Sequence, residues 1–446
     1  MEGWRHRADE PRAASAVVIG ASMAGLCAAR VLAPRFDRVT VLDRDTLPDG
    51  PVDRGQVPQG RHPHLLLAGG AQLLEGWFPG LLPELYDGGA VELDQSADVQ
   101  WYQNGGHLRR PCTRARGPSM SRPFLEWTVR RRLDLLPNVE IRSGGAVEDI
   151  ELDRAGERVE GVRLAGGGTE PADLVVDASG RQARSVAWLE AAGFAAPALS
   201  RVQVGTRYVS QELRRTAAPA RDWKLAGVVD DPVSKRMAIA LPIEGERWLV
   251  VFGGMHGEVA PEDPGDRLDY ARDLPSPEIA DVLEASDPLG PTVTHRFPAS
   301  QRRHVERMKR FPVGWVLLGD AVASFNPIYG QGMTSAAQQA AALGRALDRS
   351  GGIDRSACRR YFRAAGRVVD VAWSTAVGAD FAYPETTGPK PRGADLSNRY
   401  ADRVLTAAQR DDTVAVRFNE VVAMLRRPES LMTPPIVRRV LRATAS

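Results

Sequence analysis

Apolar and polar positions recur with different periods along the chain, and the period predicts the element. Three short runs of small and β-branched residues, each ending at a glycine-containing turn, predict buried strands at 16–19, 172–176 and 315–318. Apolar residues at helical spacing predict helices at 65–78, 121–136 and 334–347. Two alternating runs around the turn 244–247 predict a hairpin. Strands separated by helices favour an α/β fold with an inserted β-rich segment.

The stretch 16–45 has the pattern of a strand, a tight turn, an apolar helix and a second strand. Gly20 and Gly25 bracket the turn, and Asp43 ends the second strand about twenty residues later. This order is typical of a dinucleotide-binding unit, in which the helix N-terminus faces a pyrophosphate and the acid binds the adenosine ribose. Gly25 lets helix and strand pack closely. Ser22 replaces the usual middle glycine, so a purely structural βαβ unit is the alternative interpretation.

Length and composition limit what the chain can be. Its 446 residues can form two or three domains with a large core. The net charge is +2 and the charges are dispersed, so nucleic acid is not an expected partner. Cys27, Cys112 and Cys358 are few and scattered, which predicts reduced thiols in a cytoplasmic protein. Residues 1–14 lack an apolar signal core and no apolar run can span a bilayer, so we expect a soluble chain.

Two histidines, His62 and His64, stand in a segment rich in proline, glycine and arginine that covers residues 46–64. A metal site needs further ligands, and no cysteine, glutamate or third histidine lies nearby in the sequence. We therefore expect a hydrogen-bonding loop and no metal.

Arg122, Glu126 and Arg130 recur every four residues on one face of the predicted helix at 121–136. Two interpretations of this face are open. The three side chains can contact a cofactor, or they can form a solvated charge ladder.

The stretch 315–333, WVLLGDAVASFNPIYGQGM, indicates a second place where a strand ends at a ligand. Asp320 follows the strand, and a carboxylate there can hold the ribityl hydroxyls of a flavin. Gly330 and Gly332 stand where the next helix begins. Bare backbone N–H groups can there approach the flavin N1/O2 edge, where negative charge develops on reduction.

These two stretches resemble the FAD-dependent monooxygenases of the para-hydroxybenzoate hydroxylase-like superfamily. Further segments are similar to the bacterial branch that contains the monensin and lasalocid polyether epoxidases, and the resemblance covers nearly the whole chain. The segments are GRHPHLLLAGGAQLLEGWFPG, SRPFLEWTVRRRL, DLVVDASGRQARSVAWLEAAGF and GDAVASFNPIYGQGMTSA.

The resemblance implies roles for individual residues around FAD. Arg122 approaches the flavin ring, Asp320 binds the ribityl chain, and Pro327 and Gly332 lie near the flavin C4a edge. The predicted cofactor-binding residues are Gly20, Ser22, Met23, Ala24, Gly25, Asp43, Arg44, Arg61, Arg122, Asp177, Gly319, Asp320, Pro327, Gly330, Gln331, Gly332 and Met333.

The motif after the predicted strand at 172–176 departs from the superfamily. The usual Asp-Gly pair is Ser179-Gly180 here, and Ala183 replaces a frequent serine. Because this motif ordinarily serves both FAD and NADPH, the way in which the reductant docks stays open.

We predict a Rossmann-like FAD-binding domain, an interleaved β-rich substrate domain and a helical C-terminal cap. The FAD-binding segments are 14–89, 121–200 and 297–350, the substrate domain combines 90–120 with 201–296, and the cap is 351–446.

The function implied by the resemblance is insertion of one oxygen atom from O2 into an apolar, polyketide-like secondary metabolite, as in antibiotic biosynthesis. Epoxidation and hydroxylation are both open. Reduced FAD forms a C4a-hydroperoxide in this chemistry and the protein supplies a dry, oriented pocket, so no essential acid–base side chain is predicted. NAD(P)H is the expected reductant, directly or through a flavin reductase.

Two other functions are alternatives. Flavin-dependent halogenases carry a lysine early in the chain and a Trp-x-Trp-x-Ile-Pro stretch. The first lysine here is Lys224, and no such tryptophan pair occurs. FAD can also be a structural element in a cyclase or binding protein without redox turnover.

Overall fold

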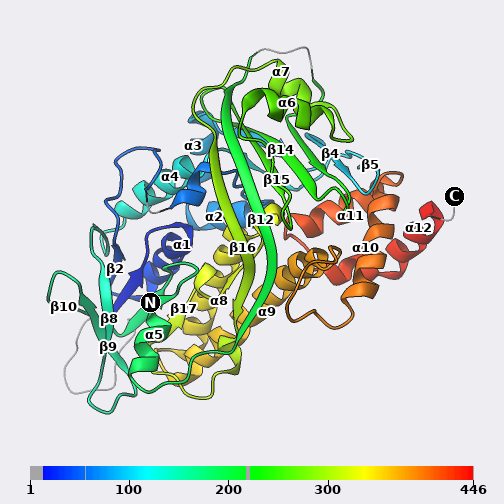
Figure 1. The fold of residues 1–446 in the computed structure, drawn as a ribbon. Coiled ribbons are helices and arrows are strands. Elements are labelled where there is room, and N and C mark those ends of the chain that lie inside the picture. The colour runs from blue at the N-terminus through cyan, green and yellow to red at the C-terminus, as the bar shows by residue number, and fades with distance from the viewer. Residues whose placement is uncertain (1–13, 56, 217–220, 445–446) are drawn as a thin grey trace.

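A computed structural model describes residues 14–55, 57–216 and 221–444 (Figure 1). It confirms the α/β class, with a parallel sheet, a large second sheet and a run of helices toward the C-terminus. Residues 1–13, in which we expect no signal sequence, lie outside the described part. Among the described helices, none combines the length and the apolar character needed to cross a bilayer.

The parallel sheet has five strands in the order β17-β11-β1-β2-β7, and all neighbouring pairs run parallel. Its strands are β1 (Ser15–Ile19), β2 (Arg38–Asp43), β7 (Val139–Ser143), β11 (Leu174–Asp177) and β17 (Trp315–Leu317). β1, β11 and β17 are buried along their whole length, as is typical of parallel strands covered on both faces. The three predicted buried strands are therefore confirmed.

Helices α1 (Met23–Leu32), α8 (Gly332–Ser350) and α9 (Arg355–Asp380) pack in succession beside this sheet. The buried face of α8 is rich in small residues, with five alanines and Gly344, which lets α1 and α9 approach it closely. At the contact between α9 and β17, Tyr361 is fully buried and its hydroxyl donates a hydrogen bond to the Leu317 carbonyl at 2.7 Å.

Helices α2 (Ala68–Trp77) and α4 (Arg122–Asp134) confirm the helices predicted at 65–78 and 121–136. Ser121 caps α4, because its hydroxyl accepts a hydrogen bond from the Phe124 N–H at 3.3 Å. The shorter elements around them are α3 (Leu81–Asp87), α5 (Arg184–Ala191), the antiparallel sheet β8 (Val147–Leu152), β9 (Val159–Leu164) and β10 (Thr169–Pro171), and the pair β3 (Val91–Asp94) and β6 (Arg116–Ser119).

The large sheet has eight strands in the order β18-β16-β12-β15-β14-β13-β4-β5. All neighbouring pairs are antiparallel except β13 with β4. The strands are β4 (Val99–Gln103), β5 (Gly106–His107), β12 (Leu199–Arg214), β13 (Leu225–Val229), β14 (Arg236–Ile243), β15 (Arg247–Gly254), β16 (Val293–Arg303) and β18 (Ala323–Ser324). The β14–β15 pair confirms the predicted hairpin.

Helices α6 (Pro264–Arg272) and α7 (Glu278–Glu284) cover one face of this sheet, where Phe252 packs edge-on against Tyr270. The sequence pattern did not predict these two helices. The division into domains stays a prediction. The long strands β12 and β16, central in Figure 1, cross its boundaries at 200/201 and 296/297.

Helices α10 (Ala394–Ala408), α11 (Asp412–Val422) and α12 (Pro434–Thr444) form a group beside the β4–β5 end of the large sheet (Figure 1). Val404, Val414 and Ile436 are buried between them. Asn104, in the turn after β4, ties the sheet to α10 by donating to the Asp402 carbonyl at 3.0 Å.

Candidate functional site

One cavity of about 1940 Å³ is lined by the parallel sheet, the large sheet and the C-terminal helices. It begins at the carboxyl ends of β1 and β2, where open α/β sheets bind their ligands. It then passes the first residues of α4 and α8 and reaches α10 and α11. Typical small-molecule pockets are about 300–1,000 Å³, so this cavity can hold a dinucleotide and a second molecule.

The cavity brings together thirteen of the seventeen residues predicted to bind FAD. Their contact with FAD stays a prediction, but their presence in one cavity is a structural finding. They are Gly20, Ser22, Met23, Ala24, Asp43, Arg44, Arg122, Asp320, Pro327, Gly330, Gln331, Gly332 and Met333.

The other four predicted residues do not line this cavity. Two of them are packing glycines: a Cβ on Gly25 would lie 1.7 Å from the Gly20 carbonyl oxygen, and one on Gly319 would lie 2.6 Å from the Ala24 Cβ. Gly25 therefore has the packing role predicted for it, and Gly319 allows a similar approach to α1.

Asp177 and Arg61 make contacts elsewhere. The buried Asp177 carboxylate accepts hydrogen bonds from the N–H groups of Ser179 at 2.9 Å and Ser185 at 3.2 Å, which fixes the turn after β11. The exposed Arg61 side chain pairs with Asp53, with 3.2 Å between Nε and Oδ2. The structure thus gives these two residues local roles.

The turn between β1 and α1 requires a glycine at its first position. Gly20 has a φ of +104°, and a Cβ there would meet the Ala178 carbonyl oxygen at 2.7 Å. The sharp turn places Ser22, Met23 and Ala24 on the cavity, where the first N–H groups of α1 have no intrahelical partners. This turn contains no acidic residue, which suits an anion.

Ser22, in place of the usual middle glycine, joins α1 to α4. Its hydroxyl accepts a hydrogen bond from Arg122 Nη2 at 2.7 Å and donates one to Glu126 Oε1. Arg122 Nε also donates to Glu126 Oε1, at 2.8 Å. Because Glu126 is 4% exposed and Arg130 is 7% exposed, the solvated charge ladder is the wrong interpretation of this face.

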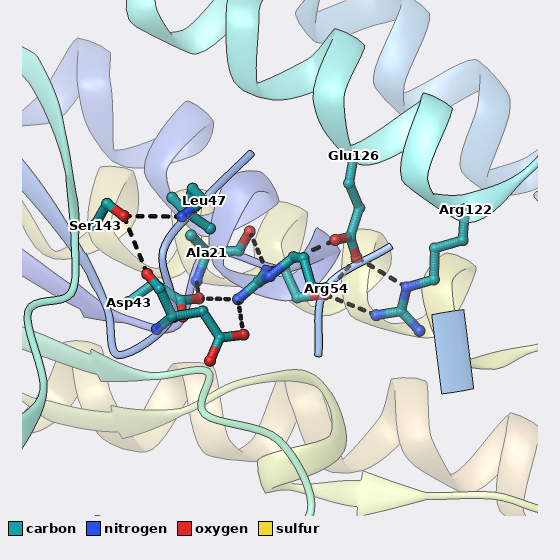
Figure 2. Close-up of polar contacts among 9 residues, drawn as sticks. Ala21, Asp43, Leu47, Arg54, Arg122, Glu126 and Ser143 are labelled. Carbon is teal, nitrogen blue, oxygen red and sulfur yellow. Dashed lines mark hydrogen bonds and ion pairs between the residues drawn. The ribbon is translucent and has the colours of Figure 1, made fainter. Parts of the chain in front are cut away.

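Arg54 lies among three carboxylates at the start of the cavity (Figure 2). Its Nη2 is 2.7 Å from Asp43 Oδ2 and 2.9 Å from Asp45 Oδ2, and its Nη1 is 3.8 Å from Glu126 Oε2. Burial disfavours the charged guanidinium, but the carboxylates outweigh burial and raise the pKa of Arg54. Arg54 therefore stays charged beside the α1 turn.

The atoms around Asp43 fit a dinucleotide. Asp43 accepts hydrogen bonds from the N–H groups of Ala21 at 2.7 Å and Asp45 at 2.9 Å, and a carboxylate offers about four acceptor positions. Beside it, the buried atoms Asp45 Oδ1 and Arg54 Nε have no hydrogen-bond partner within the described residues. The open acceptor, Asp45 Oδ1, matches a ribose hydroxyl, and the open donor, Arg54 Nε, matches a phosphate oxygen.

His64 holds Arg122 from the other side. His64 Nδ1 is 2.7 Å from the His62 carbonyl oxygen and must donate to it, so Nε2 is the acceptor for Arg122 Nη1 at 3.0 Å. His62 Nδ1 contacts the Ser210 hydroxyl at 2.7 Å, which confirms the predicted hydrogen-bonding loop. Burial lowers the pKa of His62 to about 4, and burial together with Arg122 lowers that of His64 to about 3.

Asp320 and the first residue of α8, Gly332, both line the part of the cavity predicted to hold the flavin. Asp320, in the short helix η4 (Gly319–Ala321), opens into the cavity. Its enclosed position raises its pKa, while Arg122 and Arg181 oppose that shift. No described atom lies within 4 Å of the position that a Cβ on Gly332 would take. This space at the first residue of α8 fits an edge of a flat ring.

Sequence reasoning missed several polar residues of this cavity, among them Asp45, Tyr208 and Arg54. Asp45 had a signal, because it repeats the acid of Asp43 two residues later. Tyr208 also had one: alternate positions of β12 are buried, and Thr206, Tyr208 and Ser210 put polar groups on that buried face. Arg54 stands in an irregular loop and has no local signal.

Solved structures of other proteins share this fold. PqsL of Pseudomonas aeruginosa, described as a probable FAD-dependent monooxygenase, has a similar structure, with a TM-score of 0.62 at 20% identity over 83% of this chain and 97% of PqsL. The flavin-dependent brominase Bmp2 has a TM-score of 0.65 at 16% identity over 96% of this chain and 98% of Bmp2. The chain therefore has the para-hydroxybenzoate hydroxylase-like FAD-binding fold.

In sequence, the chain is 36% identical over 445 residues to protein Rv3254 of Mycobacterium tuberculosis, which is 96% of this chain and 93% of Rv3254. It belongs to the same family as Rv3254. No protein-family model matches the chain.

Proposed function

We propose that this protein is a FAD-dependent monooxygenase that inserts one oxygen atom from O2 into an apolar small molecule. One observation carries the proposal: a single cavity runs from the α1 turn, which suits a dinucleotide, to an apolar region beside α10 and α11. The resemblance to polyether epoxidases and the fold shared with PqsL support a flavin enzyme of this kind.

The proposed FAD site follows the cavity from the adenosine end to the flavin ring. The first turn of α1 binds the diphosphate, carboxylates bind the sugar hydroxyls, and two guanidinium groups face the phosphates and the ring. When bound, FAD supplies the oxygen chemistry, while the chain binds, orients and excludes water. The proposed contact residues are Asp43, Asp45, Arg54, Arg122 and Asp320, all of which line the cavity.

The proposed substrate region lies between the large sheet and the C-terminal helices. Its walls suit an apolar molecule and would keep water away from the reacting atoms, and the resemblance to polyether epoxidases supports a polyketide-like secondary metabolite as that molecule. Epoxidation of an alkene and hydroxylation are both compatible with such walls. The apolar residues that line this part include Trp101, Ile239, Leu241, Val404, Leu405 and Phe418.

Labelled oxygen tests the proposed reaction. FAD-loaded protein is incubated with NAD(P)H, a flavin reductase and apolar metabolites from its own gene neighbourhood, and product masses are measured. We expect one heavy oxygen from labelled O2 and no effect of added bromide on the product. Label drawn from water would contradict the proposal, a brominated product would favour the halogenase, and flavin that NAD(P)H never bleaches would favour a redox-silent protein.

We also propose that NAD(P)H docks transiently at residues 179–184. Arg181 lines the cavity there, donates to the Ser324 hydroxyl at 3.1 Å and lies 5.1 Å from the centre of the Phe297 ring. Replacing Arg181 or Arg184 with alanine should slow flavin reduction and leave FAD content unchanged. Arg154→Ala, in the exposed turn between β8 and β9, is the control. Reduction at the wild-type rate in all three variants would exclude this docking site.

A further inference from the structure

Asp380, the last residue of α9, places a carboxylate behind the wall of the cavity. The residue is fully buried. Its Oδ1 accepts hydrogen bonds from Asn326 Nδ2 and from the Tyr329 hydroxyl, each at 3.0 Å. Its Oδ2 is buried as well and has no hydrogen-bond partner within the described residues. With hydrogen bonds to only one of its two oxygens, the buried carboxylate is poorly stabilised as an anion, and Tyr329 lies at Oδ1 to deliver a proton.

Among the described residues, none that acts on the Asp380 carboxylate supplies a positive charge to stabilise its ionised form. His256 is kept apart from it by Thr386, whose hydroxyl contacts His256 Nε2 at 3.0 Å and donates to the Asp380 backbone carbonyl at 2.6 Å. Burial raises the pKa of Asp380 to about 7, although the bonds from Asn326 and Tyr329 oppose this shift. The titratable side chains that face it are the phenols of Tyr208, Tyr329 and Tyr383.

Tyr329 connects this buried carboxylate to the cavity. It belongs to the short helix η5 (Pro327–Tyr329) and lines the cavity next to Pro327, the residue predicted to lie near the flavin C4a edge. The Tyr208 hydroxyl reaches Asn326 Oδ1 at 2.9 Å, but an amide is a poor carrier of protons. Within the described residues, Tyr329 is thus the ionisable side chain that both lines the cavity and hydrogen-bonds to Asp380.

We propose that Tyr329 and Asp380 form a proton-transfer pair for the molecule bound in the cavity, an inference that rests on the proposed function. In this proposal Tyr329, which lines the cavity, is the catalytic residue, and its hydroxyl contacts the bound molecule. Asp380 is a positioning residue that accepts the proton released by Tyr329 and holds it. This pair supplies the acid–base side chain that the sequence did not predict.

The transfer is balanced in protons and electron pairs. An ionisable hydroxyl in the cavity gives its proton to the Tyr329 oxygen, while Tyr329 gives its own proton to Asp380 Oδ1. One O–H bond breaks and one forms at the tyrosine, so Tyr329 stays neutral. The cavity hydroxyl becomes an oxyanion, Asp380 becomes a neutral acid, and the reverse step returns the proton.

Infrared spectroscopy tests whether Asp380 titrates. The C=O band of a neutral carboxyl should disappear from wild-type protein as the pH rises through about 7. It should be missing at every pH near neutrality in Asp380→Asn, which has almost the same shape and keeps an acceptor for Asn326 and Tyr329. A band that persists in this variant would overturn the proposal.

The rate of proton uptake tests the role of Tyr329. After a rapid drop in pH, the carboxyl band grows as Asp380 is protonated, and Tyr329→Phe should slow this growth by about a hundredfold or more. Tyr361→Phe is the matched control, because Tyr361 is also buried but its hydroxyl contacts the Leu317 carbonyl. Uptake as fast in Tyr329→Phe as in wild type would overturn the proposal.

These measurements need neither FAD nor substrate. Protein that never takes up FAD but shows the expected titration and rates would contradict the proposed function and support the pair. Protein that carries FAD and transfers oxygen, but shows neither effect, would support the proposed function and exclude the pair.

Discussion

The hydroxyl of Ser22 accepts a hydrogen bond from Arg122 Nη2 at 2.7 Å and so links the first turn of α1 to the first turn of α4. Ser22 stands where dinucleotide-binding turns usually have a glycine. It is the N-cap of α1 but makes no side-chain hydrogen bond to that helix. The serine therefore positions the Arg122 guanidinium at the cavity instead of capping its own helix.

Replacing Ser22 with alanine should lower the free energy of unfolding by about 1.5–3 kcal/mol, since the lost hydrogen bonds involve the charged groups of Arg122 and Glu126. Urea unfolding measures this change. A stability of Ser22→Ala equal to that of wild type would show that the link is not stabilising.

Gly20→Val should abolish FAD retention. The backbone has a φ of +104° at this residue, and a side chain would collide with the Ala178 carbonyl, so the turn would have to move away from the proposed diphosphate site. Absorbance of bound flavin per protein, before and after added FAD, measures retention.

Gly50→Val is the matched control, because no described atom beyond its chain neighbours lies within 4 Å of the Gly50 Cβ position, and its φ is not positive. It should retain FAD as wild type does. Full FAD content in Gly20→Val would contradict the proposed binding site.

The elements that the sequence predicted correctly are those with a strong local period. The strand at 16–19 and the hairpin around 244–247 have uninterrupted apolar or alternating patterns, and both are present. α6 and α7 were missed because they span only nine and seven residues and carry many charges. Short helices of this kind are stabilised by packing, here against Trp248 and Phe252, more than by their own sequence.

The candidate site was predictable where one segment supplies both shape and chemistry. Gly20 and Ser22 line the cavity because a single turn places them there. Arg54 and Glu126 are 72 positions apart, and only the tertiary fold brings them together. The sequence did contain a signal for Asp380. It lies at helical spacing after Val369, Trp373 and Ala376, on the buried face of α9, where an acidic residue is unusual.

His62, which is buried, and His64, which is half-buried, should make the protein less stable in acid. The pKa of His62 is about 4 and that of His64 about 3, below the value of 6.5 for a free histidine. The unfolded chain therefore binds more protons than the folded one below about pH 6.5, and the free energy of unfolding falls as the pH falls. Each histidine contributes a slope of up to about 1.4 kcal/mol per pH unit.

Urea unfolding at several pH values between about 7 and 5 measures this slope. His64→Gln removes one titrating group and should reduce the slope by about one proton, with a similar reduction for His62→Gln. The same slope in wild type and both variants would show that other groups control acid stability.

A bulky residue at Gly332 should damage oxygen transfer more than FAD binding. Gly332 opens α8 onto the cavity with no atom within 4 Å of its Cβ position, so Gly332→Leu would place its side chain in the space proposed for the flavin edge and the substrate. A displaced substrate or admitted water should divert the reduced flavin to hydrogen peroxide. The measurement is peroxide released per NAD(P)H consumed, together with bound FAD.

Gly352→Ala is the control, because Gly352 also has open space at its Cβ position but lies outside the cavity. It should release as little peroxide per NAD(P)H as wild type. The space at the Cβ position of Gly332 is open, so Gly332→Leu should fold normally. If this variant releases no more peroxide per NAD(P)H than wild type, oxygen transfer takes place elsewhere in the cavity.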